Sequence, residues 1–500
     1  MDYPTFEGLI KGLEAESERS PAHFRTKVFL ISNCAYIVLA AVFVVMGALI
    51  YFLANRVLNH SGSVSLLVML CMTFVPTLFV TLRAFLIRLE APTGFELTPK
   101  NAPEIFKILK KMQQKLNGPD FHRVIINAEY NAAIVQNPRW GLFGGYKNHL
   151  IIGLPYLFGT SPKETLATIA HEYGHVAGNH GKLGAWVYRQ RVTFGNLRDQ
   201  LEKTSEDNLL NGLLYRAVYW FWPYFNAYTF VLSRQNEYEA DRTATQLIGA
   251  SPNATGLIRD TLLGSWIHQH FWPIIYKQAN RHHEPAFKPY ANMQKIFASS
   301  YAEWATAPKL QAAWRVESSL DDTHPCLSER VTAIGEKAVL PAPIQESAAE
   351  KLLGKLAIEI AHQFDADWWQ REKSDWQQHH QRSTKALSRI KSLNEQAIES
   401  LPIMDLHELA MLSVEFDASH AKMRLSILLN QSSGNFSKAD LEYGKLLLQE
   451  RNDAGLKHIE KAGLADKTLL EDCAHIGYYY LLEHKGEAAA SQWWDNIYSA

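Results

Sequence analysis

Two long apolar runs near the N-terminus dominate the hydrophobic pattern of this chain. Residues 28–55 and 61–82 contain no charged side chain, and Pro76 lies inside the second run. A helix of about 20 apolar residues spans a bilayer, and membrane helices tolerate proline. A signal peptide would be shorter and would not be followed at once by a second apolar run. The pattern therefore predicts a hairpin of two transmembrane helices, with spans at about 28–54 and 63–83.

Basic residues flank this hairpin on one side of the membrane. Only Arg56 lies between the spans, whereas seven others precede the first span or follow the second: Lys11, Arg19, Arg25, Lys27, Arg83, Arg88 and Lys100. Short cytoplasmic segments carry an excess of Lys and Arg. We therefore expect both ends of the hairpin, and the chain that follows it, to lie in the cytoplasm.

After the hairpin, helical and strand-like periods alternate. Residues 103–116 have apolar positions at helical spacing, whereas residues 124–136 and 148–158 read as strands separated by a turn at Gly144-Gly145. The segment that follows is again helical. A small sheet is thus expected to lead directly into a helix.

An uncharged segment rich in aromatic residues lies farther along, at residues 217–233. Its length is borderline for a span, and Trp and Tyr prefer the membrane interface. We interpret it as an interfacial or half-buried helix; a buried core helix and a third span are the alternatives.

The C-terminal third of the chain shows a period of 34 residues or close to it. Small residues recur at two positions and a large apolar residue recurs at a third: Ala410, Gly444 and Gly477; Ala421, Gly455 and Ala489; Leu425, Ile459 and Trp493. This pattern matches a helix-turn-helix repeat of tetratricopeptide length, in which stacked pairs offer a surface for peptides or partners. A plain helical bundle is the alternative.

Composition narrows the function classes. The formal net charge of −1 gives no basic footprint for nucleic acid. The four cysteines (Cys34, Cys71, Cys326 and Cys473) form no disulfide framework or cysteine-based metal site, which favours a reducing compartment for the soluble part.

The strongest chemical signal is HEYGH at residues 171–175. On a helix, His171 and His175 lie on one face and can reach one metal ion, and Glu172 projects beside it. Zinc held by two histidines lowers the pKa of a bound water, whose proton a neighbouring carboxylate can take. Such a short motif also arises by chance, so its weight depends on the rest of the chain.

A third ligand is expected from a later helix. In SRQNEYEADR, Glu237 and Asp241 are four residues apart and share a helix face, whereas Glu239 points elsewhere. One carboxylate could bind the metal while the other accepts a hydrogen bond from a ligand histidine. The alternative is a solvated acidic patch on a surface helix.

His324 and Arg330 are further candidates. Both could donate hydrogen bonds to an oxyanion; alternatively, they are a histidine at a helix start and a salt-bridged arginine. His180 follows His171 by nine residues, on the opposite helix face, and is interpreted as structural.

The stretches HEYGH, NEYEAD and THPCLSER occur in this order behind the predicted hairpin. In this, the chain resembles the membrane-associated zinc metallopeptidases that include the heat-shock protease HtpX and the Ste-type CaaX prenyl protease. The resemblance covers about residues 90–335. It implies a gluzincin with one zinc ion per chain, bound by His171, His175 and Glu237. It also implies that Glu172 is the general base.

The same resemblance implies supporting roles. Asp241 would orient a ligand histidine, and His324 and Arg330 would line the cleft. The strand around Asn131-Ala132-Ala133 would be the sheet edge that holds substrate as an added strand. Misfolded or damaged membrane proteins would be the substrates, at a bacterial inner membrane.

The chain departs from these relatives in two respects. They are expected to have more transmembrane helices, which disfavours an intramembrane cage for lipidated substrates here. The helical tail is an addition, similar to that of envelope quality-control members with tetratricopeptide repeats.

We therefore predict an α+β, mostly helical chain in three parts. These are a two-helix membrane anchor (residues 1–90), a zincin catalytic domain with a small sheet (91–335) and a C-terminal α-helical repeat domain (336–500). The predicted function is a membrane-anchored zinc endopeptidase that acts on proteins or peptides, with a protein partner at the repeats.

Two other functions compete with this prediction. The chain could be a latent or non-catalytic zinc-containing scaffold whose repeats bind partners, although the intact HExxH, Glu237 and Asp241 set argues against it. A narrower alternative is a processing protease for lipidated C-termini.

Overall fold

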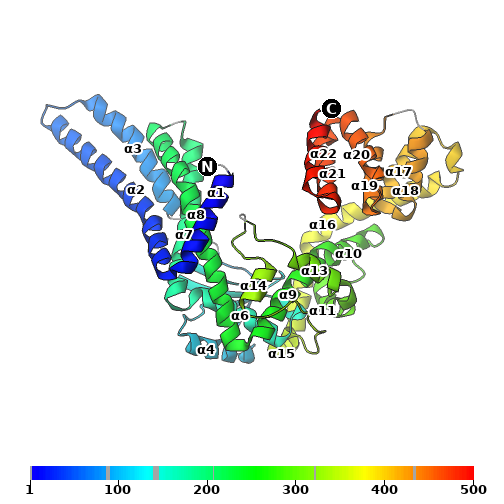
Figure 1. Ribbon diagram of the computed structural model, residues 1–500, viewed down its shortest axis with the longest axis horizontal. Coiled ribbons are helices and arrows are strands. Elements are labelled where there is room, and N and C mark those ends of the chain that lie inside the picture. Colours follow the sequence, from blue (N-terminus) through cyan, green and yellow to red (C-terminus); the bar gives the residue numbers. More distant parts are fainter. Residues whose placement is uncertain are drawn as a thin grey trace. The chain divides into compact units, whose positions relative to one another are not determined.

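The computed structural model describes residues 3–85, 91–138, 146–206, 208–319, 322–431 and 435–499 (Figure 1). It divides into two compact units, one of residues 1–272 and 288–367 and one of residues 273–287 and 368–500. Helices predominate and one small sheet is present, which confirms the predicted mostly helical α+β class. Residues 336–367, assigned to the C-terminal domain from sequence, group with the first unit.

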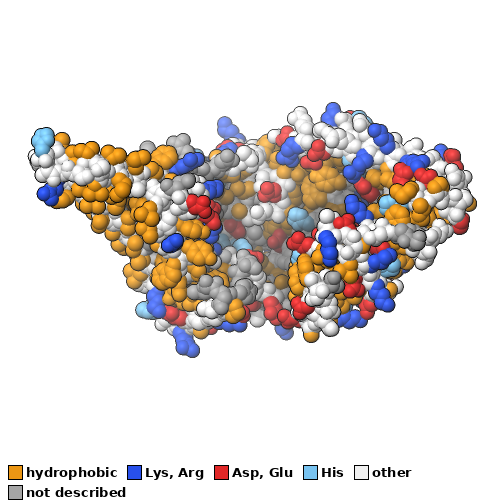
Figure 2. Space-filling model, turned by 90° about the horizontal axis from the view of Figure 1, so that it is seen from above, with side chains coloured by type: hydrophobic (Ala, Val, Ile, Leu, Met, Phe, Trp, Pro, Cys, Tyr) orange, Lys and Arg blue, Asp and Glu red, His pale blue; other side chains and the backbone are white. Residues whose placement is uncertain are grey.

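Two helices correspond to the predicted membrane hairpin: α2 (Pro21–Leu58) and α3 (Val64–Phe85), the latter with Pro76 inside. Both are long and apolar enough to cross a membrane, and only 6% and 11% of their most apolar windows are buried. Figure 2 shows their hydrophobic side chains covering the surface of the hairpin, at the left of the view. Such an apolar exterior is weak evidence for a membrane protein. Arg88 lies outside the described residues.

Helices α7 (Gly178–Thr204) and α8 (Leu209–Ile248) form a second long hairpin, which packs against the first. The Asn208 side chain caps α8 and donates a hydrogen bond of 2.9 Å to the Thr73 carbonyl of α3. Thr73 lies within one turn of Pro76 in α3. The two hairpins are thus joined by a specific polar contact.

Residues 217–233 lie within α8 and are half-buried. Tyr219 and Trp220 are exposed, whereas Phe225 and Phe230 are buried against other helices. One helix face therefore packs in the protein and the other remains open.

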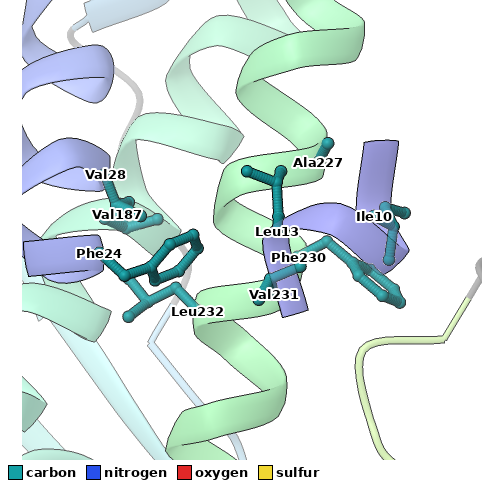
Figure 3. Close-up of a cluster of buried hydrophobic side chains, with 9 residues drawn as sticks. All are labelled: Ile10, Leu13, Phe24, Val28, Val187, Ala227, Phe230, Val231 and Leu232. Atoms are coloured by element: carbon teal, nitrogen blue, oxygen red, sulfur yellow. The ribbon is translucent and has the colours of Figure 1, made fainter. Parts of the chain in front are cut away.

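The N-terminal helix α1 (Tyr3–Arg19) packs on α8. A buried apolar cluster joins side chains from α1, α2, α7 and α8 (Figure 3): Ile10, Leu13, Phe24, Val28, Val187, Ala227, Phe230, Val231 and Leu232. The segment before the first predicted span is thus part of the first unit.

The sheet has the strand order β1-β2-β4-β3. Its strands are β1 (Phe95–Leu97), β2 (Arg123–Asn127), β3 (Ala132–Pro138) and β4 (Tyr146–Gly153), with α4 (Pro103–Leu116) after β1. Strand β4 runs parallel to β2 and antiparallel to β3, and β3 is an edge strand. The 124–136 segment is therefore two strands rather than the single strand predicted.

The other predicted strand, 148–158, ends earlier than expected because α5 (Leu154–Gly159) begins after β4. Gly153 ends the strand, and only glycine fits there, because a Cβ at this position would lie 1.6 Å from the Glu129 carbonyl oxygen. The predicted turn at Gly144-Gly145 lies outside the described residues.

The remaining helices of the first unit surround the sheet and α8. They are α6 (Pro162–Val176), α9 (Ala250–Trp266), a π-helical turn (Ile267–Phe271), α11 (Pro289–Ser299), α12 (Tyr301–Trp304), α13 (Ala307–Trp314), α14 (Leu327–Ala333) and α15 (Ala348–Leu353). A buried ion pair of 2.9 Å between Glu164 and Arg259 joins α6 to α9.

The second unit contains α10 (Trp272–Lys277), most of α16 (Lys355–Leu393) and three successive helix pairs. The pairs are α17 (Ile403–Phe416) with α18 (Ala418–Gln431), α19 (Ser437–Gln449) with α20 (Ala454–Ala465), and α21 (Leu470–Lys485) with α22 (Glu487–Ser499). A Cβ on Gly444 would lie 2.9 Å from the Gly455 carbonyl oxygen, so small residues permit α19 and α20 to approach closely.

Candidate metal centre

Helix α6 presents the HExxH motif. Ser161 and Glu164 form a capping box at its start, and Pro162 occupies its first turn, where no backbone donor is needed. One turn separates His171 from His175, so their rings meet at a centroid distance of 4.8 Å and an interplanar angle of 86°. Their Nε2 atoms are 3.2 Å apart and can address one ion.

Helix α8 supplies the third group. The Glu237 carboxylate lies 3.5 Å from Nε2 of His171 and 3.3 Å from Nε2 of His175. One ligand atom from each residue falls within 4.8 Å of the others, a geometry that could hold a metal ion. Among the residues that the structure describes, no other histidine, cysteine or acidic group of three does so. Two imidazoles and one carboxylate are a donor set that suits zinc and leaves a further position open.

Close packing of α6 on α8 brings these groups together. Gly174 makes it possible, since a Cβ there would lie 3.1 Å from Cα of Ala240 and 3.3 Å from Oγ1 of Thr243. We did not single out Gly174 from the sequence, because a glycine inside a helix carries no local signal of a tertiary contact.

Asp241 contacts His171 on the side of the ring that faces away from Glu237 and His175. Its side chain is fully buried, and Oδ1 lies 2.9 Å from Nδ1 of His171. A carboxylate at this nitrogen favours the tautomer that donates from Nδ1 and leaves the Nε2 lone pair free for a metal. Arg330 binds the same carboxylate bidentately, with Nε to Oδ2 and Nη2 to Oδ1 both at 2.8 Å.

The structure thus places Arg330 in a salt bridge, which is one of the two alternatives left open from sequence. Its Nη2 is also 3.9 Å from Glu237. His324 is 61% exposed in its side chain, and its Nδ1 lies 3.0 Å from Glu237 Oε2. Both candidates therefore lie near Glu237. Arg330 approaches it from the protein interior, and His324 approaches it from the solvent side. The side chain of His180 lies outside the described residues.

The ionisable residues of the cluster shift one another's pKa values toward the charged forms. Burial alone would raise the pKa of Asp241, but hydrogen bonds from Arg330 and His171 outweigh it and lower the pKa to about 2. Burial opposes ionisation of Glu237 too, yet its interactions with His171, His175 and His324 hold its pKa far below the ordinary value. Burial would lower the pKa of His171, but Asp241 and Glu237 raise it to about 9.

Glu172 lies between the cluster and the sheet. Its Oε2 accepts a hydrogen bond of 3.3 Å from the backbone N–H of Ile134, in edge strand β3. A strand added at this edge would run past Glu172. Ala132 and Ala133 of the predicted stretch begin β3 and Asn131 precedes it, and β3 lies at the edge of the sheet, as the resemblance implied.

Comparison with known families agrees with this geometry. Residues 99–338 match the sequence model of Peptidase family M48, a range that contains β2, β3, α6, α8 and α14. The match supports a metallopeptidase hydrolase of a family that is zinc-dependent in general. No curated protein and no solved structure matches the chain.

Proposed function

We propose that this protein is a membrane-anchored zinc endopeptidase with one zinc ion per chain. The observation that carries the proposal is the convergence of His171, His175 and Glu237 from two helices, over an Asp241–Arg330 pair. This arrangement fits a catalytic metal site better than a structural one, because a structural zinc site is closed by a fourth protein ligand.

The residues take distinct roles in this proposal. When bound, zinc supplies Lewis acidity for water and for the scissile carbonyl. Glu172 removes a proton from the attacking water and passes it to the leaving amine. His324, exposed beside Glu237, donates to the oxyanion. Arg330 donates hydrogen bonds from Nε and Nη2 to Asp241. Its role is therefore to hold that carboxylate, which in turn orients His171.

Substrate is proposed to lie along β3 as an added strand, which places a backbone carbonyl beside Glu172. Such binding recognises extended backbone rather than a particular side chain. Unfolded segments of membrane proteins are therefore the proposed substrates, in agreement with a quality-control role.

The membrane placement is also a proposal. Helices α2 and α3 would span a bacterial inner membrane, with the catalytic unit in the cytoplasm, as the flanking basic residues favour. Labelling of single cysteines from either side of intact cells tests this. Labelling of a cysteine placed at exposed Glu129 from outside the cell would refute the orientation.

The helix pairs α17–α22 are proposed to form a tetratricopeptide-like array that binds a partner or substrate. Their 34-residue period and the close approach at Gly444 and Gly455 support it. A cavity of about 460 Å³ in this unit is lined by residues that include Arg451, Tyr479 and Tyr480, residue types that are enriched at binding hot spots.

The test of the enzymatic proposal is a paired measurement in detergent. Zinc content and cleavage of casein are compared for the wild type, Glu172→Gln and the matched control Glu129→Gln, an exposed carboxylate. We expect equal zinc in all three, with cleavage lost only in Glu172→Gln. Zinc without cleavage in the wild type would favour the scaffold function instead, and wild type without zinc would refute the site.

A further inference from the structure

The zinc-ligand segment of α8 contacts α1 and the first turns of α2 on the face away from α6. Two ion pairs make the connection. Arg234 Nη1 lies 2.9 Å from Oε1 of Glu14 in α1, and Glu239 pairs with Arg25 at the start of α2. Neither arginine is freely solvated, with side-chain exposures of 12% for Arg234 and 15% for Arg25.

The α8 members of these pairs, Glu239 and Arg234, lie on other sides of the helix than Glu237. Glu239 follows Glu237 by two residues, about 200° around a helix, and therefore lies on the opposite face. Arg234 precedes Glu237 by three residues, on the adjoining side. The Glu239–Arg25 pair thus contacts the helix face opposite Glu237, and the Arg234–Glu14 pair contacts the side next to it, while Glu237 faces α6.

On the face of α8 toward α1 and α2, charged contacts follow the apolar ones along the helix. The buried cluster shared with α1 and α2 includes Phe230, Val231 and Leu232 of α8 (Figure 3). Beyond it, a cavity of about 410 Å³ lies between α1 and α8, and both members of both ion pairs line it. Across this cavity, the charged pairs bridge the two segments.

We propose that Glu14 and Arg25 are positioning residues for the zinc ligand Glu237. A zinc site tolerates little displacement of its ligands, and Glu237 stands on a different helix from the two histidines. The ion pairs fasten the Glu237 segment of α8 to α1 and α2 while its other face packs on α6, so they restrict its shift and rotation at the metal site. This inference rests on the proposed function for the identity of the metal.

Zinc affinity is the readout that tests it, measured on the full chain in detergent by competition with a chromophoric chelator. The variants are Glu14→Gln and Arg25→Gln. Removing residues that orient a metal ligand directly lowers affinity about 10–100-fold; these residues act one step farther out, so we expect about 3–10-fold for each. Helical content by circular dichroism should match that of the wild type.

Lys27→Gln is the matched control. Lys27 lies two residues from Arg25 and pairs with Glu16 inside the N-terminal segment. Its removal deletes a similar charge and ion pair without releasing Glu239 or Arg234. We expect wild-type zinc affinity.

A charge exchange separates positioning from general damage. Arg25→Glu combined with Glu239→Arg restores the pair in reverse and should recover most of the affinity lost in Arg25→Glu alone. Wild-type affinity in both Glu14→Gln and Arg25→Gln would overturn the proposal, and so would a loss that the exchange does not recover. The proposed peptidase activity is tested apart from this, because Glu172→Gln changes cleavage and not zinc binding.

Discussion

Helices α6 and α8 both supply the candidate metal centre, but they are built differently. Helix α6 is short, begins at a capping box and carries two ligands one turn apart. Helix α8 is 40 residues long, carries one ligand and is held by ion pairs to residues more than 200 positions away in the sequence. The geometry of the α6 ligands is thus local, whereas that of Glu237 depends on packing.

The largest effect should come from deleting a ligand on either helix. His175→Ala and Glu237→Ala should each reduce zinc content to background and abolish cleavage, because two remaining ligands hold the ion weakly. Metal analysis and a casein assay measure this, with His268→Ala, an exposed histidine, as the control. Retention of zinc in Glu237→Ala would remove α8 from the site and end the comparison.

A smaller effect on zinc binding is expected from Asp241, the α8 residue that contacts His171 of α6. Asp241→Asn keeps the size of the side chain but removes the charge that Arg330 and His171 both contact. Zinc affinity should fall about 10–100-fold, as for other residues that orient a metal-binding histidine. Asp199→Asn, which neutralises a half-exposed aspartate paired with Arg198, is the control and should keep wild-type zinc affinity.

The contact between α6 and α8 itself can be perturbed through Gly174. Gly174→Val adds atoms that would lie against Ala240 and Thr243, so the helices must separate. Overpacking of this kind costs about 1–3 kcal/mol, and here the zinc affinity should fall with the stability. Gly8→Val, in α1 where a Cβ meets no atom within 4 Å, is the control. Unchanged zinc affinity in Gly174→Val would show that the ligands tolerate a shift between the helices.

The smallest effect should come from the local structure of α6. Ser161→Ala removes the side chain that accepts from the Glu164 N–H, and loss of such a cap costs about 1 kcal/mol of stability. Zinc affinity should stay close to that of the wild type, since the histidine spacing is unaffected. A drop in affinity as large as that of Asp241→Asn would contradict the view that α6 is locally determined.

Sequence patterns predicted the chemistry of the site better than its support. His171, His175, Glu237 and Asp241 were candidates because helical spacing of polar residues is a local signal, whereas the separate roles of Glu237 and Asp241 came only from the family resemblance. Arg330 was assigned to the cleft, with a salt bridge as the alternative, because its partner is 89 residues away. The ion pairs of Glu14 and Arg25 escaped notice, since one charged residue on a polar helix resembles any other.

The same division holds for the fold. Long apolar runs predicted α2 and α3, and the 3.6-residue period predicted α4, because each depends on residues near in sequence. Strand boundaries were less accurate: residues 124–136 form two strands because the chain turns at 128–131, where Gly153 admits its backbone.

The sequence by itself determined the two-histidine motif, the paired carboxylates of the later helix and the apolar segments, since spacing within one helix and hydrophobic length are properties of a single stretch of chain. Only the tertiary structure decided that α8 meets α6 at Gly174, that Arg330 holds Asp241 and that α1 packs behind the ligand helix. These contacts join residues tens to hundreds of positions apart, and their formation depends on shape and burial that no local pattern encodes.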